Sequence, residues 1–175
     1  EEDSYLLEKE VRKISKNKKV LDLGSGSGIQ ALSALKSGAK SVLASDISPE
    51  SLAFLKKNKI PCVKSDLFEN IHENFDLIVF NPPYLPEDTL EDSESALATT
   101  GGKKGDEIIL RFLKQAKSHL NANGVILLLL SSLTPKKRID KLLKSLKFNK
   151  EFLSSKKLFM ETLYVLKISN KLGLQ

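Results

Sequence analysis

At residues 21–28 the chain reads Leu21-Asp22-Leu23-Gly24-Ser25-Gly26-Ser27-Gly28. The pattern predicts a strand over residues 19–23 that runs into a glycine loop and then into a helix. Glycine has no Cβ, so a ligand can approach this loop closely, and the helix that follows offers free N–H groups at its start. Because position 29 is Ile29 rather than Gly or Ala, the spacing does not fit a dinucleotide fingerprint. Taken alone, the loop is also compatible with a plain tight turn.

The carboxylate of Asp22, directly before the glycines, narrows the choice of ligand. An anion at this place repels a pyrophosphate but attracts a cation. S-adenosyl-L-methionine carries an ammonium and a sulfonium, so Asp22 suits its amino-acid end, either directly or through water. Gly24 and Gly26 would let this cofactor lie against the backbone.

Two further acidic residues follow strands in the same way. Asp46 ends the second predicted strand, at about the spacing of the acidic residue that binds ribose hydroxyls in nucleotide-binding units. Asp66 and Leu67 follow the third, where Asp66 could accept from an adenine amino group while Leu67 packs on the ring. Each aspartate alone could be a helix cap or turn former. Three of them at the carboxyl ends of successive strands, where open α/β sheets bind ligands, predict an S-adenosyl-L-methionine site.

Strand and helix patterns alternate along the chain and finish in two strands. The predicted strands cover residues 19–23, 41–45, 60–64, 75–80, 125–130, 148–154 and 162–168. The predicted helices cover residues 4–14, 29–37, 105–120 and 135–146, and a further helix has Ser48 as its N-cap and Pro49 at its first position. We expect one domain over residues 1–175, with an α/β, Rossmann-like, mostly parallel sheet, helices on both faces and a terminal antiparallel hairpin.

The composition excludes several classes of protein. No apolar run is long enough to span a bilayer, and the one cysteine, Cys62, excludes an internal disulfide and a cysteine-based zinc site. We therefore expect a cytoplasmic protein without a bound metal, in which Cys62 is buried in a strand. The net charge of +6 raises nucleic acid as a partner. The excess is almost entirely lysine, however, and arginine reads phosphates and bases better, so the charge favours a nucleic-acid substrate only weakly.

The fourth predicted strand ends in Asn81-Pro82-Pro83-Tyr84. Two prolines make this backbone stiff, with its carbonyls facing outward. The Asn81 side-chain oxygen and the Pro82 carbonyl could each accept one hydrogen of an –NH₂ group and aim its lone pair at the sulfonium methyl, while Tyr84 lies flat on a planar acceptor. Catalysis would then rest on placement and fixed dipoles. Taken alone, Asn-Pro-Pro is equally well a strong turn.

Residues 85–104 show little periodicity and form a long connection. They carry five acidic side chains: Glu87, Asp88, Glu91, Asp92 and Glu94. An acidic loop beside the acceptor motif repels phosphates and favours a basic protein segment.

These motifs together resemble the HemK-like family of protein (glutamine-N5) methyltransferases, which modify class 1 translation release factors. The resemblance covers nearly the whole chain and includes two further motifs, Glu2-Asp3-Ser4-Tyr5-Leu6-Leu7 and Gly101-Gly102-x-x-Gly105. It implies a seven-stranded class I methyltransferase sheet, and as methyl acceptor a glutamine side-chain amide in a Gly-Gly-Gln motif. It also implies two sets of contacts: Ser4, Asp22, Gly24, Asp46, Asp66, Leu67 and Asn81 to the cofactor, and Asn81, Pro82, Pro83 and Tyr84 to the substrate.

The short chain is similar to the archaeal and eukaryotic branch of this family. Members of that branch work with a small zinc-binding activator subunit that pairs along an edge strand. The resemblance therefore implies a heterodimer, with the partner along residues 60–64.

Other functions stay open on the sequence. Adenine-N6 and guanine-N2 methyltransferases acting on RNA or DNA use the same Asn-Pro-Pro-Tyr motif, because their acceptors are also planar amino groups. A protein lysine is a further acceptor that the resemblance allows. From a different class comes a non-catalytic scaffold that binds S-adenosyl-L-methionine and a partner, although none of the motifs is broken.

Overall fold

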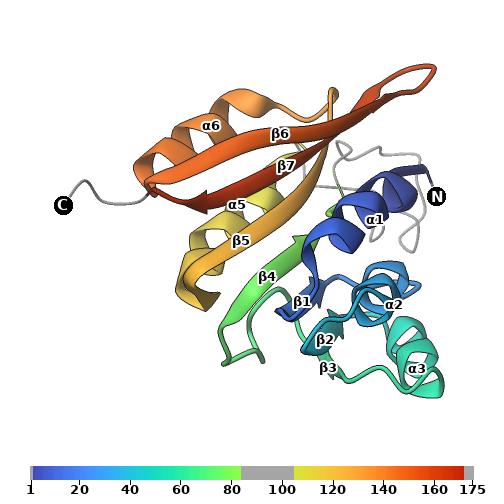
Figure 1. Cartoon of the computed structure of the whole chain (residues 1–175). Helices are drawn as coiled ribbons and strands as arrows, with labels where there is room; N and C mark the ends of the chain where they lie inside the picture. Colours follow the sequence, from blue (N-terminus) through green and yellow to red (C-terminus); the bar gives the residue numbers. More distant parts are fainter. Residues whose placement is uncertain (1, 84–104, 172–175) are drawn as a thin grey trace.

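Seven strands form one sheet, in the order β3-β2-β1-β4-β5-β7-β6, in the computed structural model of the chain, which describes residues 2–83 and 105–171 (Figure 1). The strands are β1 (Lys19–Leu23), β2 (Ser41–Asp46), β3 (Cys62–Lys64), β4 (Phe75–Phe80), β5 (Leu120–Ser131), β6 (Phe148–Lys157) and β7 (Thr162–Asn170). The helices are α1 (Glu2–Ile14), α2 (Ile29–Lys36), α3 (Pro49–Lys57), α5 (Glu107–Ala116) and α6 (Lys136–Ser145), with a short 3₁₀ turn, η1 (Lys117–His119). Strands β1 to β5 pair in parallel, and β7 is antiparallel to both β5 and β6. The predicted fold class, with its terminal antiparallel hairpin, is confirmed.

Alternation along the strands divides the apolar core into two layers. In β4, Leu77 and Val79 belong to the layer that contains α1, α2 and α3. Ile78 and Phe80 belong to the other layer, against α5 and α6. Because both faces of β4 are covered (Figure 1), its sequence is a nearly continuous apolar run, as is usual for central parallel strands.

Local sequence sets the starts of two helices. Ser48 caps α3, since its Oγ accepts a hydrogen bond of 3.3 Å from the N–H of Ser51, and Pro49 takes the first helical position as predicted. Helix α2 starts behind Gly28, whose φ of 72° is in the left-handed region. Among the helices of residues 2–83 and 105–171, none combines the length and apolarity needed to cross a bilayer.

Three sequence predictions need correction. Strand β3 begins at Cys62 rather than Ile60, because Pro61 has no N–H for the ladder and the N–H of Ile60 donates to Leu55 O instead. Cys62 is half-buried rather than buried, since a three-residue edge strand is covered incompletely. The helix predicted to end at residue 120 stops at Ala116, and β5 already starts at Leu120.

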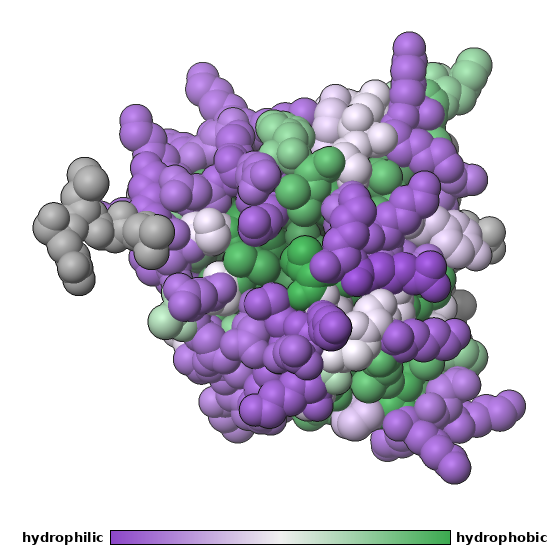
Figure 2. All heavy atoms as spheres, viewed as in Figure 1, coloured by the Kyte–Doolittle hydropathy of each residue, from purple (hydrophilic) through white to green (hydrophobic). Residues whose placement is uncertain are grey.

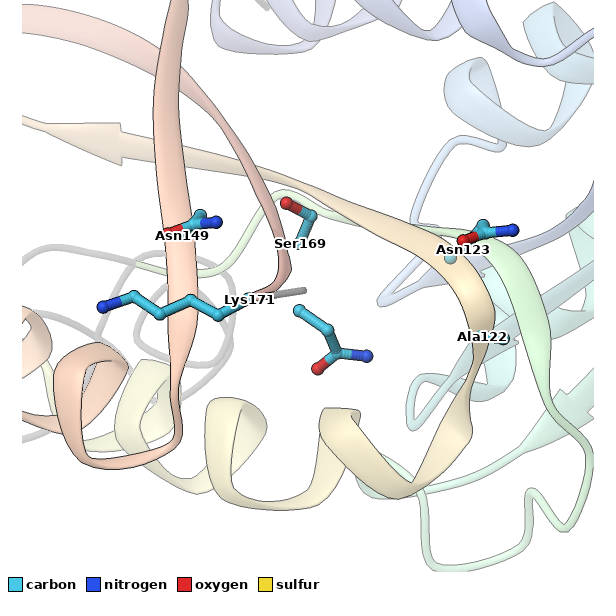
Figure 3. Close-up of a pocket in the computed structure, with 7 residues that line it drawn as sticks. Ala122, Asn123, Asn149, Ser169 and Lys171 are labelled. Atoms are coloured by element: carbon cyan, nitrogen blue, oxygen red, sulfur yellow. The ribbon is translucent and has the colours of Figure 1, made fainter. Parts of the chain in front are cut away.

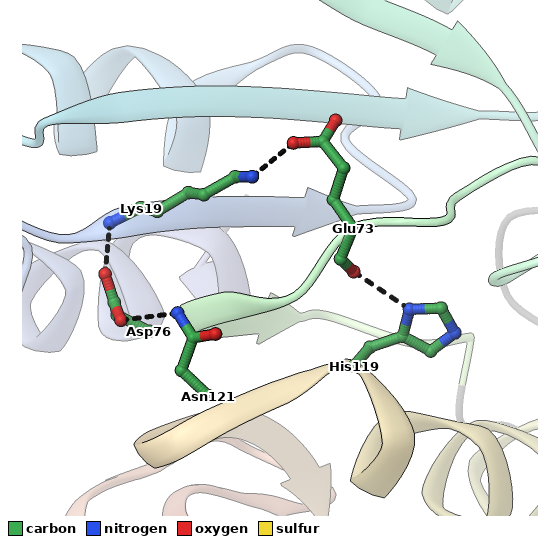
Figure 4. A network of polar contacts seen from close by, with 5 residues as sticks. All are labelled: Lys19, Glu73, Asp76, His119 and Asn121. Atoms are coloured by element: carbon green, nitrogen blue, oxygen red, sulfur yellow. Dashed lines mark hydrogen bonds and ion pairs between the residues drawn. The ribbon is translucent and has the colours of Figure 1, made fainter.

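A polar network ties the amino ends of the central strands together (Figure 4). The carboxylate of Asp76 accepts the backbone N–H of Lys19 at 2.8 Å and the side-chain amide of Asn121 at 2.7 Å. The hydrogen bond from Lys19 is the main reason that the pKa of Asp76 lies below its usual value. Glu73 adds an ion pair with the ammonium of Lys19, and its carbonyl oxygen lies 3.0 Å from Nδ1 of His119. These contacts fix the starts of β1 and β4 and the turn before β5 relative to one another.

Candidate active site

The strand register brings the glycine loop and the Asn-Pro-Pro segment to one place. Leu23 at the end of β1 pairs with Phe80 at the end of β4, so Gly24 and Asn81 leave the sheet side by side. On the other side of β1, Leu23 pairs with Ser45, and Asp46 follows it. The sheet order reverses between β1 and β4, and such a switch point is where open α/β sheets bind their ligands.

The glycine loop is held by its neighbours and open toward solvent. The N–H of Ser25 donates to Ser45 O at 2.9 Å, and the N–H of Gly26 donates to Oδ2 of Asp46 at 2.8 Å. The φ angles of Gly24, Gly26 and Gly28 are 65°, 51° and 72°, which only glycine adopts readily. A Cβ on Gly26 would meet no atom within 4 Å, whereas one on Gly28 would lie 3.0 Å from a methyl of Leu55. Gly26 therefore faces free space, and Gly28 serves close packing.

Asp22 lies beneath this loop rather than at its surface. It is 2% exposed, and its Oδ2 accepts hydrogen bonds from Ser25 Oγ at 2.5 Å and from the N–H of Ala31 at 2.9 Å. Burial raises the pKa of Asp22 to about 6, although both hydrogen bonds oppose the shift. Asp22 therefore joins the glycine loop to α2, and it would gain from a cation bound above it.

Asp46 and Asp66 both lie at the carboxyl edge, but in different surroundings. The two oxygens of Asp46 accept from the N–H groups of Gly26 and Ser48, each at 2.8 Å. Asp66 is exposed, and its Oδ2 accepts a hydrogen bond of 2.9 Å from Nη2 of Arg111 on α5. Sequence reasoning missed Arg111, because nothing in its spacing shows that α5 brings this side chain to Asp66.

Leu67 completes the end of the third strand. It is buried and has a φ of 49°, a left-handed conformation that is uncommon for leucine. The hydroxyl of Ser65 holds this turn, since it donates to Leu67 O at 2.8 Å and accepts the N–H of Asn70 at 3.0 Å. A hollow of about 610 Å³ opens next to it, lined by Asp66, Phe68, Glu69, Arg111, Lys114, Gln115, Ser118 and His119.

The side chain of Asn81 is oriented by the N-terminal helix. Its Nδ2 donates a hydrogen bond of 2.8 Å to Oδ2 of Asp3. Its Oδ1 is buried and accepts no hydrogen bond from any described residue. A buried acceptor without a donor is costly, and at the carboxyl edge of the sheet this oxygen is available for a hydrogen that a ligand supplies. Pro82 is buried and Pro83 half-buried beside it, whereas Tyr84 lies outside the described residues.

Ser4, predicted as a cofactor contact, lies at the start of α1. Its carbonyl oxygen accepts a hydrogen bond of 2.8 Å from Nε2 of Gln30 in α2. This bond fixes the start of α1 against α2. The Oε1 of Gln30 is buried and has no donor among the described residues. Neither Gln30 nor Asp3 received a role from the sequence; Asp3 belongs to the quoted N-terminal motif, but only the fold brings it to Asn81.

A second hollow, of about 460 Å³, lies at the opposite end of the sheet (Figure 3). It is lined by Ala122, Asn123, Gly124, Asn149, Ser169, Asn170 and Lys171. None of the predicted site residues borders it. The candidate site is therefore the carboxyl edge, where the glycine loop, the aspartates and Asn81 meet.

Comparison with known proteins decides the family. Residues 2–160 match the family described as the methyltransferase small domain. The chain belongs to the methyltransferase small domain family. A relative from Methanocaldococcus jannaschii with the provisional name protein N5-glutamine methyltransferase is 41% identical over 173 residues, which cover 94% of this chain and 87% of the relative. The release factor glutamine methyltransferase of Borreliella burgdorferi is 37% identical over 125 residues, which are 63% of this chain and 44% of that protein.

Solved structures of methyltransferases share the fold of this chain. The Mtq2–Trm112 complex of E. cuniculi, described as responsible for methylation of the translation termination factor eRF1, has a TM-score of 0.80 and 27% identity, covering 98% of this chain and 96% of that one. The ribosomal protein L11 methylase of Lactobacillus delbrueckii subsp. bulgaricus has a TM-score of 0.72 and 28% identity, covering 98% and 80%. The family match and these relatives together confirm the predicted resemblance and enzyme class, and they support S-adenosyl-L-methionine as the methyl donor.

Proposed function

We propose that residues 1–175 form one S-adenosyl-L-methionine-dependent methyltransferase domain that methylates the side-chain amide of a protein glutamine. The acceptor in this proposal is the Gly-Gly-Gln motif of a class 1 translation release factor, and the place of action is the cytoplasm, where translation occurs. The observation that carries the acceptor chemistry is the buried Oδ1 of Asn81, which has no donor among residues 2–83 and 105–171 and lies next to the glycine loop. The names of the relatives from M. jannaschii and B. burgdorferi and of the E. cuniculi complex support the same acceptor.

The residues at the carboxyl edge fit the cofactor. S-adenosyl-L-methionine supplies an electrophilic methyl group on a sulfonium, and its ammonium, ribose and adenine need distinct partners. We assign the ammonium to Asp22, Ser4 and the backbone at Gly24 and Gly26, and the free space at Gly26 leaves room for it. Each carboxylate oxygen has a second lone pair, so Asp46 can accept from ribose hydroxyls while it holds Gly26 and Ser48. Asp66 and Leu67 then receive the adenine.

The acceptor nitrogen is placed by two fixed oxygens. An amide –NH₂ has two hydrogens, and Oδ1 of Asn81 and the carbonyl of Pro82 accept one each. The carboxylate of Asp3 polarises the Asn81 amide from its other end, which strengthens Oδ1 as an acceptor. Localising charge on the nitrogen makes it a better nucleophile. As the new C–N bond forms, the bond from the methyl group to sulfur breaks and leaves the neutral thioether S-adenosyl-L-homocysteine, and the amide proton then passes to water. Tyr84 packs against the flat substrate amide, and Pro83 keeps the loop stiff.

We assign the partner subunit to the side of the sheet where β3 is the outermost strand. Strand β3 is short and half-exposed, and its neighbours Ile47 and Phe54 are each 44% exposed. Exposed apolar side chains beside an open strand edge are typical of a covered surface. We propose that a small zinc-binding activator pairs along residues 60–64; the E. cuniculi relative is a complex with Trm112.

A methylation assay and a measurement of cofactor affinity test this function. The protein, with and without the small activator, is incubated with S-adenosyl-L-methionine and a release factor that carries Gly-Gly-Gln, and tandem mass spectrometry locates the methyl group. We expect methylation at that glutamine and its loss in Asn81→Ala, while cofactor affinity is retained. Parallel assays offer RNA, DNA and a lysine-containing protein as substrates. If one of these is methylated while the glutamine is not, it replaces glutamine as the assigned acceptor. Binding of S-adenosyl-L-methionine without methyl transfer to any of these substrates would favour a non-catalytic scaffold.

A further inference from the structure

The β6–β7 hairpin projects from the same edge of the sheet as the candidate site. Leu163 at the start of β7 pairs with Ser131 at the end of β5, so the turn of the hairpin, residues 158–161, lies beyond the carboxyl end of β5. Figure 1 shows the hairpin extending past the other strands on the side where α1 begins. A hydrogen bond of 2.7 Å from the N–H of Leu158 to Glu161 O closes the turn. Its shape is therefore defined in the free protein.

The tip carries two solvent-exposed apolar side chains. Phe159 is 98% exposed and Met160 is 76% exposed, the two highest values among the large apolar residues described. Leu158 next to them packs into the core layer of α1, α2 and α3 and anchors the turn. Figure 2 shows apolar atoms at this corner of the surface beside hydrophilic ones. Two adjacent bare side chains on a fixed turn are typical of contact residues.

Two lysines lie directly before the tip, in a part of the chain that is basic overall, although Glu161 lies within the turn and Lys156 pairs with Glu2. These lysines are Lys156 and Lys157, and both are exposed. The segment from Lys136 to Lys171 contains eleven of the 28 lysines and arginines but three of the 22 acidic residues, a net charge of +8 against +6 for the whole chain. The remainder of the chain is therefore slightly acidic. A partner that binds beside Lys157 gains from a carboxylate opposite it.

An ion pair connects the hairpin to the start of α1. The ammonium of Lys156 pairs with the carboxylate of Glu2 at the start of α1. The next residue, Asp3, holds the amide of Asn81. The hairpin and Asn81 therefore both contact the first residues of α1.

We propose that the hairpin tip, Phe159 and Met160 flanked by Lys156 and Lys157, docks the protein substrate through an apolar recess bordered by acidic residues. This rests on the proposed function, since it assumes a folded protein as acceptor. Single-stranded nucleic acid is bound in positively charged grooves with aromatic platforms. A convex tip with a methionine and a phenylalanine side by side fits a recess on a folded protein instead.

The test compares steady-state methylation of the intact release factor by wild type, F159S/M160S and Phe152→Ser. Phe152 is the matched control, because it is 58% exposed on the same hairpin but lies within β6, away from the turn. For F159S/M160S we expect KM to rise roughly tenfold or more with kcat and cofactor affinity unchanged, as for loss of a hot spot. Phe152→Ser should keep the wild-type KM. Lys157→Glu should raise KM at low salt and less at high salt.

The outcomes separate this proposal from the function itself. Unchanged KM in F159S/M160S, with an active wild type, overturns docking at the tip and leaves the methyltransferase assignment standing. A fall in kcat at constant KM overturns it too, because the tip would then act on Asn81 through α1. Failure of the wild type to methylate the release factor overturns the proposed function. Two further results would give the tip a different occupant and overturn the proposal. One is inhibition of methylation by single-stranded RNA that F159S/M160S abolishes. The other is a wild-type dimer in light scattering that F159S/M160S abolishes.

Discussion

The side-chain amide of Asn81 and the carboxylate of Asp3 are joined by a hydrogen bond of 2.8 Å across 78 residues of sequence. Because Nδ2 is the donor, Oδ1 of Asn81 points away from Asp3 and stays available. Burial raises the pKa of Asp3, but hydrogen bonds, foremost that from Asn81, outweigh it and leave the pKa below its usual value. Asp3 is therefore ionised at neutral pH and fixes the orientation of the acceptor group.

Replacing Asp3 by Ala should lower kcat roughly 10- to 100-fold with little change in KM, the effect of losing a charge-assisted hydrogen bond of about 1.5–3 kcal/mol. Asp3→Asn, which keeps an acceptor oxygen, should recover part of the rate. The control is Glu8→Gln on the same helix, because Glu8 pairs with Arg12 and not with the site. Steady-state kinetics would contradict the positioning role if KM rose while kcat stayed constant.

The buried carboxyl of Asp22 should make the stability of the ligand-free protein depend on pH. Its folded pKa of about 6 exceeds the ordinary value of 3.8, so the folded state binds the proton more tightly. The stabilising contribution is therefore complete below pH 3.8 and is lost as pH rises through about 6, by about 3 kcal/mol in total. Urea unfolding of wild type and Asp22→Asn across this range isolates this contribution, since the lowered pKa values of Asp3 and Asp76 affect both proteins alike. The free energy of unfolding of the wild type relative to Asp22→Asn should fall as pH rises from 3.8 through about 6.

Cofactor binding should show the opposite trend with pH. The ammonium of S-adenosyl-L-methionine favours ionised Asp22, so affinity should increase as pH rises through about 6. In Asp22→Asn the affinity should be weaker and nearly independent of pH in the same range. Titration calorimetry at several pH values measures both. Equal pH profiles for the two proteins would separate Asp22 from the ammonium.

Gly26 and Gly28 should respond differently to alanine. Both have positive φ, which costs an alanine about 1 kcal/mol. Gly28→Ala adds a contact of 3.0 Å with Leu55, so it should be the less stable variant, by about 1–3 kcal/mol. Gly26→Ala should remain folded but lose cofactor affinity, because its methyl group enters the space above the loop. Thermal unfolding and cofactor titration of both variants distinguish stability from binding.

The ion pair of Asp66 and Arg111 should matter for binding more than for stability. Both side chains are about half exposed, at 49% and 54%, so breaking the pair should change the free energy of unfolding by less than about 1 kcal/mol. Asp66→Ala should weaken cofactor binding roughly tenfold through loss of an adenine acceptor. Arg111→Met should keep or improve affinity, since it frees the carboxylate. A loss of affinity in Arg111→Met would show that the arginine itself holds the cofactor.

Several parts of this protein follow from local sequence alone. Strand and helix periodicity, the cap at Ser48 and the prolines after Phe80 depend on neighbours along the chain, so the order of elements and the fold class could be predicted. The alternating glycines and the aspartates that follow strands could be recognised for the same reason. Parallel strands place their carboxyl ends together, which was enough to expect one binding edge.

Only the tertiary structure decided which groups meet at that edge. The contacts of Asp3 with Asn81 and of Arg111 with Asp66 join residues 78 and 45 positions apart. Their existence depends on how α1 and α5 pack across the sheet, and no local pattern reports that packing. The same holds for Asp22, whose raised pKa comes from burial beneath the loop. Local interactions determined the elements and the motifs, whereas long-range packing determined hydrogen-bond partners, charge states and the exposed hairpin tip, because these depend on surfaces that exist only once the chain is folded.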